Sequence, residues 1–137
     1  MKQTFLPLGF AWLCVAAATA SAQGMGHAGF AAAREAALAD EGALRDWHGG
    51  TLLPAFGGPY QRIFRECTTG VTAADALPFS FVVVIAADGA VEKLVADRNT
   101  RVWACMRGKL AFERLPAPPK APFHLLMHQR FRDAPPQ

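Results

Sequence analysis

The sequence predicts an α+β domain of two layers, in which a three-stranded antiparallel sheet packs on two short helices. A β-branched run with an Asp-Gly pair at 79–96 is typical of a hairpin, and an alternating segment at 122–131 adds a C-terminal edge strand. Two amphipathic segments, 59–67 and 100–110, have the periodicity of helices that cover a sheet. An additional Ala-rich N-terminal helix is expected at 28–47.

The hairpin is the centre of the predicted sheet. Asp88-Gly89 divides it, and this pair favours a two-residue type I′ turn with positive φ at both central positions. Residues 79–85 are apolar on both strand faces, which predicts a central strand that is covered on each side. Residues 91–96 are mixed, so a partly exposed strand and a bulge both fit them.

The residues before the hairpin predict two helices with a break between them. Gly49-Gly50 is expected to end the Ala-rich helix. Residues 51–58 carry one Pro and two Gly, which predicts a linker or a short extended segment. Pro59 then suits the first turn of a new helix, because a first-turn N–H has no intrahelical partner. One face of that helix holds Tyr60, Ile63, Phe64 and Cys67.

The helix after the hairpin is predicted at 100–110. Residues 97–99 supply candidate N-caps for it. Its buried stripe holds Cys105, just as the stripe of the earlier helix holds Cys67, and Trp103 beside it is expected to pack in the core. The stripe consists of Val102, Cys105, Met106 and Leu110.

The first 22 residues have the three regions of a signal peptide. Lys2 is a short basic start, residues 5–18 are apolar without a charge, and residues 20–22 form the small-x-small pattern Ala-Ser-Ala. We expect cleavage before Gln23 and a periplasmic or secreted protein. An uncleaved membrane anchor is the rival interpretation, but the apolar run is short for a bilayer span.

The mature chain is predicted to have three parts: a flexible Gly-rich segment with the Ala-rich helix at 23–58, the α+β domain at 59–132, and a loose tail at 133–137. Charge is divided unevenly, since residues 23–97 hold five basic and nine acidic side chains and residues 98–137 hold eight and two. A basic half can favour an anionic partner. These residues are scattered, however, which favours complementary faces of one solvated domain. They also lack interleaved aromatics, so no nucleic acid is expected as a partner.

Export determines how the cysteines are interpreted. Cys14 leaves with the signal peptide, and the remaining pair, Cys67 and Cys105, predicts one disulfide in an oxidising compartment. A zinc site usually needs four ligands in close pairs, which this pair does not provide. We therefore expect a structural cross-link and no cofactor.

The C-terminal strand is the candidate binding site. The apolar residues Phe123, Leu125 and Met127 alternate along this strand with the residues of its outer face. A polar face with His and Arg suits a sheet edge, to which an extended segment of an envelope protein or a peptide can add as a further strand. The residues of this outer face are His124, Leu126, His128 and Arg130.

A small metal-dependent or hydrolytic enzyme is the alternative. It would use His124 and His128 with Asp75 or Asp88. On a strand the two histidines share a face but lie roughly 13 Å apart, too far to bind one metal, whereas on a helix they can chelate one. The only serine of the mature chain, Ser80, lies in an apolar strand without a Gly-x-Ser-x-Gly elbow. These residues favour a non-catalytic module.

Three stretches carry a resemblance to a known family: FVVVIAADGAVEKLVAD (81–97), VWACMRGKLAF (102–112) and LPAPPKAPFHLLMHQRF (115–131). Together they cover about half the chain. Their order of hairpin, helix and edge strand resembles the C-terminal domain of TonB-type energy transducers. The resemblance implies a two-layer α+β domain that binds peptide segments. Those transducers keep an N-terminal anchor and a long Pro-rich spacer. Neither is expected in this chain, so the resemblance does not extend to force transmission. The chain is also similar to small exported bacterial proteins that pair a Cys before the hairpin with one in the following helix.

Overall fold

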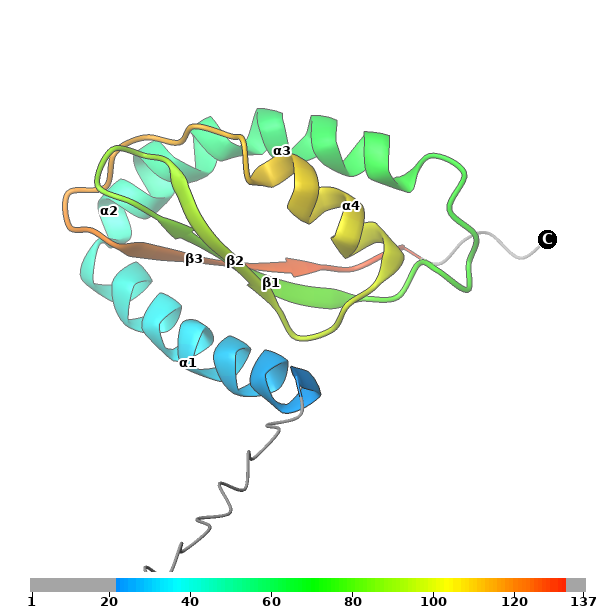
Figure 1. Cartoon of the computed structure of the whole chain (residues 1–137). Helices are drawn as coiled ribbons and strands as arrows, with labels where there is room; N and C mark the ends of the chain where they lie inside the picture. The colour runs from blue at the N-terminus through cyan, green and yellow to red at the C-terminus, as the bar shows by residue number, and fades with distance from the viewer. Residues whose placement is uncertain (1–21, 133–137) are drawn as a thin grey trace, which may run out of the picture.

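The computed structural model describes residues 22–132. The predicted signal peptide, except for Ala22, and the predicted tail at 133–137 lie outside the described residues. None of the described helices is long and apolar enough to cross a membrane. In chain order the elements are α1 (Ala22–Ala43), α2 (Arg45–Trp47), the π-helical turn η1 (His48–Leu52), α3 (Leu53–Thr68), β1 (Phe79–Ile85), β2 (Val91–Ala96), α4 (Arg101–Leu110) and β3 (Phe123–Gln129) (Figure 1).

The three strands form one antiparallel sheet in the order β2-β1-β3. β1 is central, and it pairs with β3 without interruption from Phe79 opposite Gln129 to Ile85 opposite Phe123. β2 and β3 are therefore the two edges of this sheet. The arrangement confirms the predicted α+β class, the hairpin and the C-terminal edge strand.

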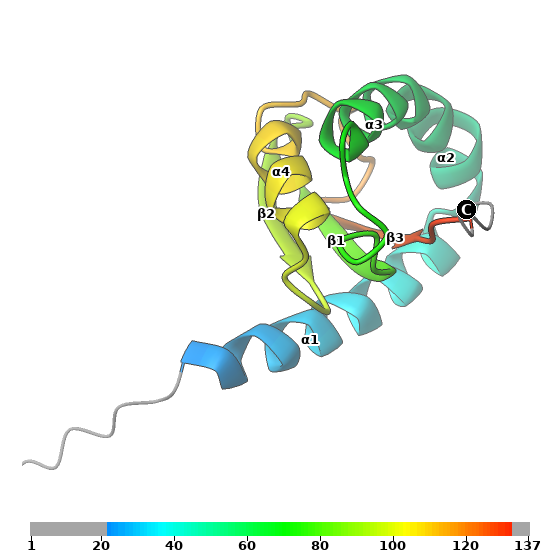
Figure 2. The same cartoon turned by 90° about the vertical axis from the view of Figure 1, so that its right-hand side faces the viewer.

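The helices α3 and α4 cover one face of the sheet (Figures 1 and 2). Phe81, Val83 and Ile85 of β1 are fully buried in the core that these helices form with the sheet. Trp103 of α4 is 3% exposed, and its ring centroid lies 4.9 Å from that of Phe81. This confirms that Trp103 has a packing role.

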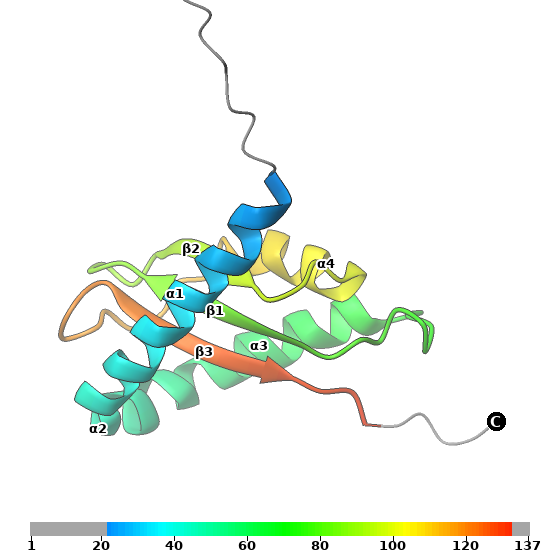
Figure 3. The same ribbon diagram turned by 90° about the horizontal axis from the view of Figure 1, so that it is seen from below.

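The helix α1 covers the opposite face, where it runs obliquely across the strands (Figure 3). Ala37 of α1 is fully buried against Val82 and Val84, with Phe30 and Leu126 partly buried around them. Both faces of β1 are therefore covered, as its apolar run predicted. α1 supplies a layer whose docking the sequence alone left undecided.

The hairpin turn differs from the predicted two-residue type I′ turn. Ala86 N–H donates to Ala90 O, which closes a three-residue loop, and only Gly89 has positive φ, at +85°. Asp88 stays at negative φ, where its side chain accepts the Ala90 N–H at 3.0 Å. A type I′ turn would place Asp88 as well as Gly89 at positive φ, where a non-glycine residue is strained. The three-residue loop avoids this strain, because it needs positive φ only at Gly89. The pairing of β1 with β2 also shifts register between Val84 and Ile85, which confirms a bulge, and β2 is partly exposed.

The segments before the hairpin are more helical than predicted. The Gly-rich residues ahead of the helix predicted at 28–47 are expected to be flexible, but they lie within α1. Gly49 and Gly50 do not end a helix but lie inside η1, and residues 51–58 continue into α3 instead of forming a linker. Buried Leu52 and Phe56 extend the stripe of α3 backwards at helical spacing, and their burial outweighs the low helix propensity of the local Gly and Pro residues.

The cap of α4 also differs from the prediction. Thr100, rather than residues 97–99, is the N-cap, and its hydroxyl oxygen accepts the Trp103 N–H at 3.0 Å. Thr100 is buried, so this contact satisfies an otherwise unpaired N–H at the start of the helix. The apolar stripe of the helix is confirmed, because Val102, Met106 and Leu110 are all fully buried.

Candidate functional site

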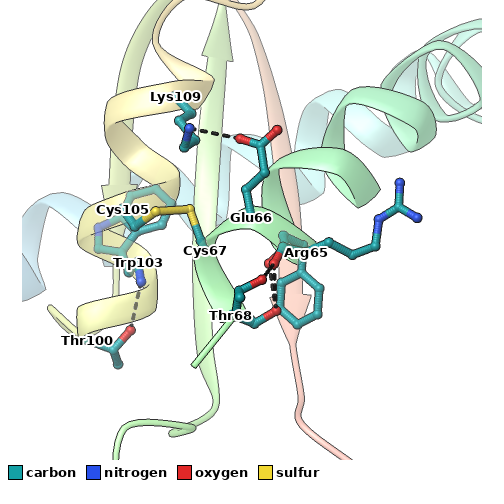
Figure 4. Close-up of a disulfide and its surroundings, with 10 residues drawn as sticks. Arg65, Glu66, Cys67, Thr68, Thr100, Trp103, Cys105 and Lys109 are labelled. Atoms are coloured by element: carbon teal, nitrogen blue, oxygen red, sulfur yellow. Dashed lines mark hydrogen bonds and ion pairs between the residues drawn. A yellow bond between two sulfur atoms is a disulfide. The ribbon is translucent and has the colours of Figure 1, made fainter. Parts of the chain in front are cut away.

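The disulfide between Cys67 and Cys105 confirms the predicted cross-link. It joins the C-terminal end of α3 to the middle of α4, with 5.7 Å between the two Cα atoms (Figure 4). Cys67 is 6% exposed and lies in the main core. Next to the bridge, Lys109 Nζ lies 2.8 Å from Glu66 Oε2, and this hydrogen bond lowers the pKa of the glutamate below its ordinary value. The site is a structural link between two helices.

Exposed ion pairs join the basic C-terminal part of the chain to the acidic part before it. Three basic residues of the C-terminal part each contact an acidic residue of the preceding part. These ion pairs are Arg101–Asp75 at 3.5 Å, Lys109–Glu66 at 2.8 Å and Arg114–Asp88 at 3.2 Å. All six side chains are substantially exposed, so each pair contributes little stability. The pairs agree with complementary faces of one domain.

The candidate binding strand β3 is an edge, but α1 already occupies half of it. The N–H of His124 donates to Asp40 Oδ2 at 3.0 Å, and the His124 ring nitrogen Nδ1 lies 2.8 Å from the same oxygen. The N–H of Leu126 donates to Glu41 Oε1 at 3.2 Å. The predicted solvated outer face is therefore wrong for His124 and Leu126, because α1 packs over both residues.

Carboxylates of α1 thus take the place that the carbonyls of a further strand would occupy. Unpaired N–H groups on a sheet edge attract other strands, and side chains that cover them prevent such pairing. Asp40 and Glu41 protect the first half of β3 in this way. His128 and Arg130 lie beyond the helix and are exposed, so they are the open residues of the predicted site, and Gln129 between them is buried.

Ser80 and His128 form a polar pair that the sequence did not indicate. They lie opposite one another on β1 and β3, with 2.8 Å between Ser80 Oγ and His128 Nδ1. The Ser80 N–H donates to Asp97 Oδ1 at 3.0 Å, and the Asp97 N–H donates back to Ser80 O. Strand register alone brings these residues together, since 48 positions separate Ser80 from His128. The pair places a hydroxyl and an imidazole within hydrogen-bonding distance of each other at the end of the sheet.

A pocket of about 160 Å³ opens beside this pair. It lies at the end of the sheet where β1 begins and β2 and β3 end, and α1 leaves this end uncovered in Figure 3. The polar residues that line it come from all three strand ends and the segments next to them. They are Ser80, Asp97, Arg98, His128, Gln129 and Arg130.

The residues of the predicted metal-dependent enzyme are not brought together. His124 contacts Asp40 and His128 contacts Ser80. Asp75 and Asp88 lie beside arginines outside this strand, as described above. Within residues 22–132, no three His, Cys, Asp or Glu side chains lie close enough together to hold a metal ion.

Two features remain for a functional interpretation: the open part of the β3 edge and the pocket at its end. No protein-family model, curated protein or solved structure matches this chain. The resemblance to TonB C-terminal domains therefore stays a prediction. The function has to be inferred from the geometry of the edge and the pocket.

Proposed function

We propose that the protein is an exported, non-catalytic binding module that takes up an extended segment of a peptide or envelope protein along residues 128–131 of the β3 edge. The observation that carries the proposal is the division of this edge. Side chains of α1 occupy the outward N–H groups of His124 and Leu126, whereas His128 and Arg130 are exposed. By the two-residue alternation of a strand, the N–H group of His128 points outward too, and Arg130 follows directly after the end of β3.

Two further features support the proposal. A disulfide is typical of proteins that fold in an oxidising compartment, and the N-terminal sequence has the pattern of an export signal. Strand addition also needs little from the side chains, because main-chain hydrogen bonds provide most of the contact. A short open edge is therefore sufficient for such contacts.

Amide chemical shifts of the isotopically labelled protein provide the test. The probe is a pool of N-acetylated ten-residue peptides with alternating apolar and polar positions. We expect shifts and slower hydrogen exchange at residues 128–131 and none along β2. Shifts confined to β2, or none at all, would contradict the proposal.

His128→Pro is the informative variant for this experiment. It removes an outward N–H, and proline is tolerated on an edge strand at such a position. Binding is expected to fall at least several-fold, because a main-chain hydrogen bond is lost. His128→Ala is the matched comparison, since it removes the same contact with Ser80 but keeps the main-chain N–H, so His128→Pro should bind several-fold more weakly than His128→Ala.

Export has its own measurement. Mass spectrometry of the protein from the cell envelope is expected to show an N-terminus at Gln23 and no free thiols. A chain that retains residues 1–22, or two free cysteines in envelope material, would contradict export with oxidation.

The Ser80–His128 contact favours a second candidate, a hydrolase with Ser80 as nucleophile and His128 as general base. Proton transfer from a serine to a histidine needs the hydrogen-bond distance that the pair has. The test is covalent labelling by a fluorophosphonate: Ser80 Oγ bonds to phosphorus, fluoride leaves, and His128 takes the hydroxyl proton. Labelling that Ser80→Ala abolishes would favour the hydrolase over the binding module.

A further inference from the structure

The lining of the pocket at the end of the sheet has more basic than acidic side chains. Arg98 and Arg130 line it and are both exposed. Among the described residues, neither guanidinium has a carboxylate oxygen within ion-pairing distance, unlike Arg62, Arg101 and Arg114. Asp97 supplies one negative charge to the lining, and its Oδ1 is held by the Ser80 N–H. Two arginines against one aspartate suit a ligand with a single negative charge.

The side chains of the lining suit a carboxylate group on the ligand. Guanidinium groups match the planar, two-oxygen geometry of a carboxylate, and hydrogen bonds between them are charge-assisted. The Ser80 hydroxyl and the His128 ring lie in the same lining. The volume of about 160 Å³ is well below the roughly 300–1,000 Å³ of sites that enclose drug-sized molecules. The pocket therefore suits a small group at the end of a larger ligand.

The helix α1 restricts which part of a peptide can lie beside His128. A peptide paired with residues 128–131 that continued along β3 would meet Glu41, which holds the Leu126 N–H. A chain that ends beside His128 avoids this obstacle. An amino end would bring an ammonium group beside Arg98 and Arg130, whereas a carboxyl end brings the complementary charge.

We propose that this pocket binds the C-terminal carboxylate of the peptide that pairs with the β3 edge. The inference rests on the proposed function, and it specifies both the ligand class and its direction. The peptide runs antiparallel to β3 along its free edge and ends beside His128, where its last residue turns over the end of the sheet so that the carboxylate lies between Arg98 and Arg130. Residues at the peptide C-terminus then determine recognition, and internal segments bind more weakly.

Two matched peptide pools test the inference. Both contain N-acetylated ten-residue peptides of the same randomised composition, one with a free C-terminal carboxylate and the other with a C-terminal amide. The unmodified protein is expected to bind the carboxylate pool at least tenfold more tightly, because charge-assisted hydrogen bonds are lost in the amide. Arg98→Gln combined with Arg130→Gln should abolish that preference. Arg65→Gln, an exposed arginine of α3 away from the pocket, is the matched control and should retain it.

The possible outcomes separate the two proposals. Equal binding of both pools with shifts at residues 128–131 would overturn the carboxylate pocket and leave the proposed function intact. A preference for the carboxylate pool that survives the double variant would overturn the assignment to Arg98 and Arg130. Failure of both pools to bind would overturn both proposals. Near-UV circular dichroism of each variant verifies that the fold is retained.

Discussion

Gly89 has a backbone conformation and a neighbour that both exclude a side chain. Its φ is +85°, and a Cβ placed on it would lie 2.0 Å from the carbonyl oxygen of Leu115. The Leu115 N–H donates to Gly89 O at 2.9 Å, so the two segments cannot separate without losing this bond. The hairpin turn is thereby joined to the chain that leads into β3.

Gly89→Ala is expected to lower the free energy of unfolding by about 2 kcal/mol or more, from the strained φ and the displaced Leu115 carbonyl. Urea unfolding followed by tryptophan fluorescence measures it. Gly108→Ala is the control, since Gly108 lies in α4 with open space around its Cβ position, and alanine there should add up to about 1 kcal/mol. Equal stability of Gly89→Ala and the natural protein would contradict the account.

Tyr60 is the only tyrosine of the chain, so its ionisation can be observed directly. It is 9% exposed, its hydroxyl donates to Gln129 Oε1, and burial raises its pKa above the ordinary value of 10.0. The folded state thus holds the proton more tightly than the unfolded state. Stability is fully present below pH 10 and is lost as pH rises through the raised pKa.

We therefore expect the tyrosinate absorbance near 295 nm to appear at higher pH in the folded protein than in urea. The urea concentration at the midpoint of unfolding should decrease as the pH is raised from 10 to the pH at which the folded tyrosine ionises. In Tyr60→Phe this part of the pH dependence should disappear. A folded-state titration that coincides with the unfolded one would refute the burial argument.

At the scale of elements, the disulfide is the link between α3 and α4. It closes a loop with a sequence separation of 38, which stabilises the fold by about 4 kcal/mol when the restriction of the unfolded chain is counted. A domain of this size has a total stability of about 5–15 kcal/mol, so the bridge is a large share.

The double variant Cys67→Ala with Cys105→Ala is expected to unfold at a much lower urea concentration, with a loss of about 3–4 kcal/mol. Alanine leaves no unpaired thiol in the core. The ion pair between Glu66 and Lys109 beside the bridge serves as the comparison, because Lys109→Ala removes only an exposed contact and should leave the urea midpoint nearly unchanged. A double variant as stable as the natural protein would show that the bridge is dispensable.

At the scale of the whole molecule, the sheet lies between two helical layers with separate cores. The larger core joins α3 and α4 to one face, and the smaller core joins α1 to the other through Ala37, Val82 and Val84. The smaller core also positions Asp40 and Glu41 over the β3 edge. Docking of α1 and protection of the edge are therefore coupled.

Ala37→Glu tests this coupling, because a buried charge without a partner is incompatible with the smaller core. We expect α1 to detach, the amides of His124 and Leu126 to exchange at least tenfold faster, and a hydrophobic dye to bind the exposed valines. The near-UV signal of Trp103 should persist, since that residue belongs to the larger core. Ala31→Glu, on the exposed side of α1, should leave all three measurements unchanged.

Local patterning was sufficient for the elements whose signals lie within a few residues. A run that is apolar on both faces identified the central strand, alternation identified the C-terminal edge, and helical spacing placed Cys67 and Cys105 on apolar stripes. Turn chemistry located the hairpin at Asp88-Gly89 but not its loop length, because Ala86–Ala90 pairing and the approach of Leu115 select a loop with one left-handed residue.

Periodicity and residue counts within the sequence are sufficient to predict the hairpin, the two amphipathic helices, the edge strand and the cysteine pair. Tertiary packing supplies the remaining features. It continued a helix through the Gly- and Pro-containing residues 51–58 because Leu52 and Phe56 are buried, and it placed α1 on the second sheet face. It also brought Asp40 to His124 and Ser80 to His128, across separations of 84 and 48 positions. Contacts over such distances leave no periodic trace in the chain, so the candidate site depends on packing and strand register.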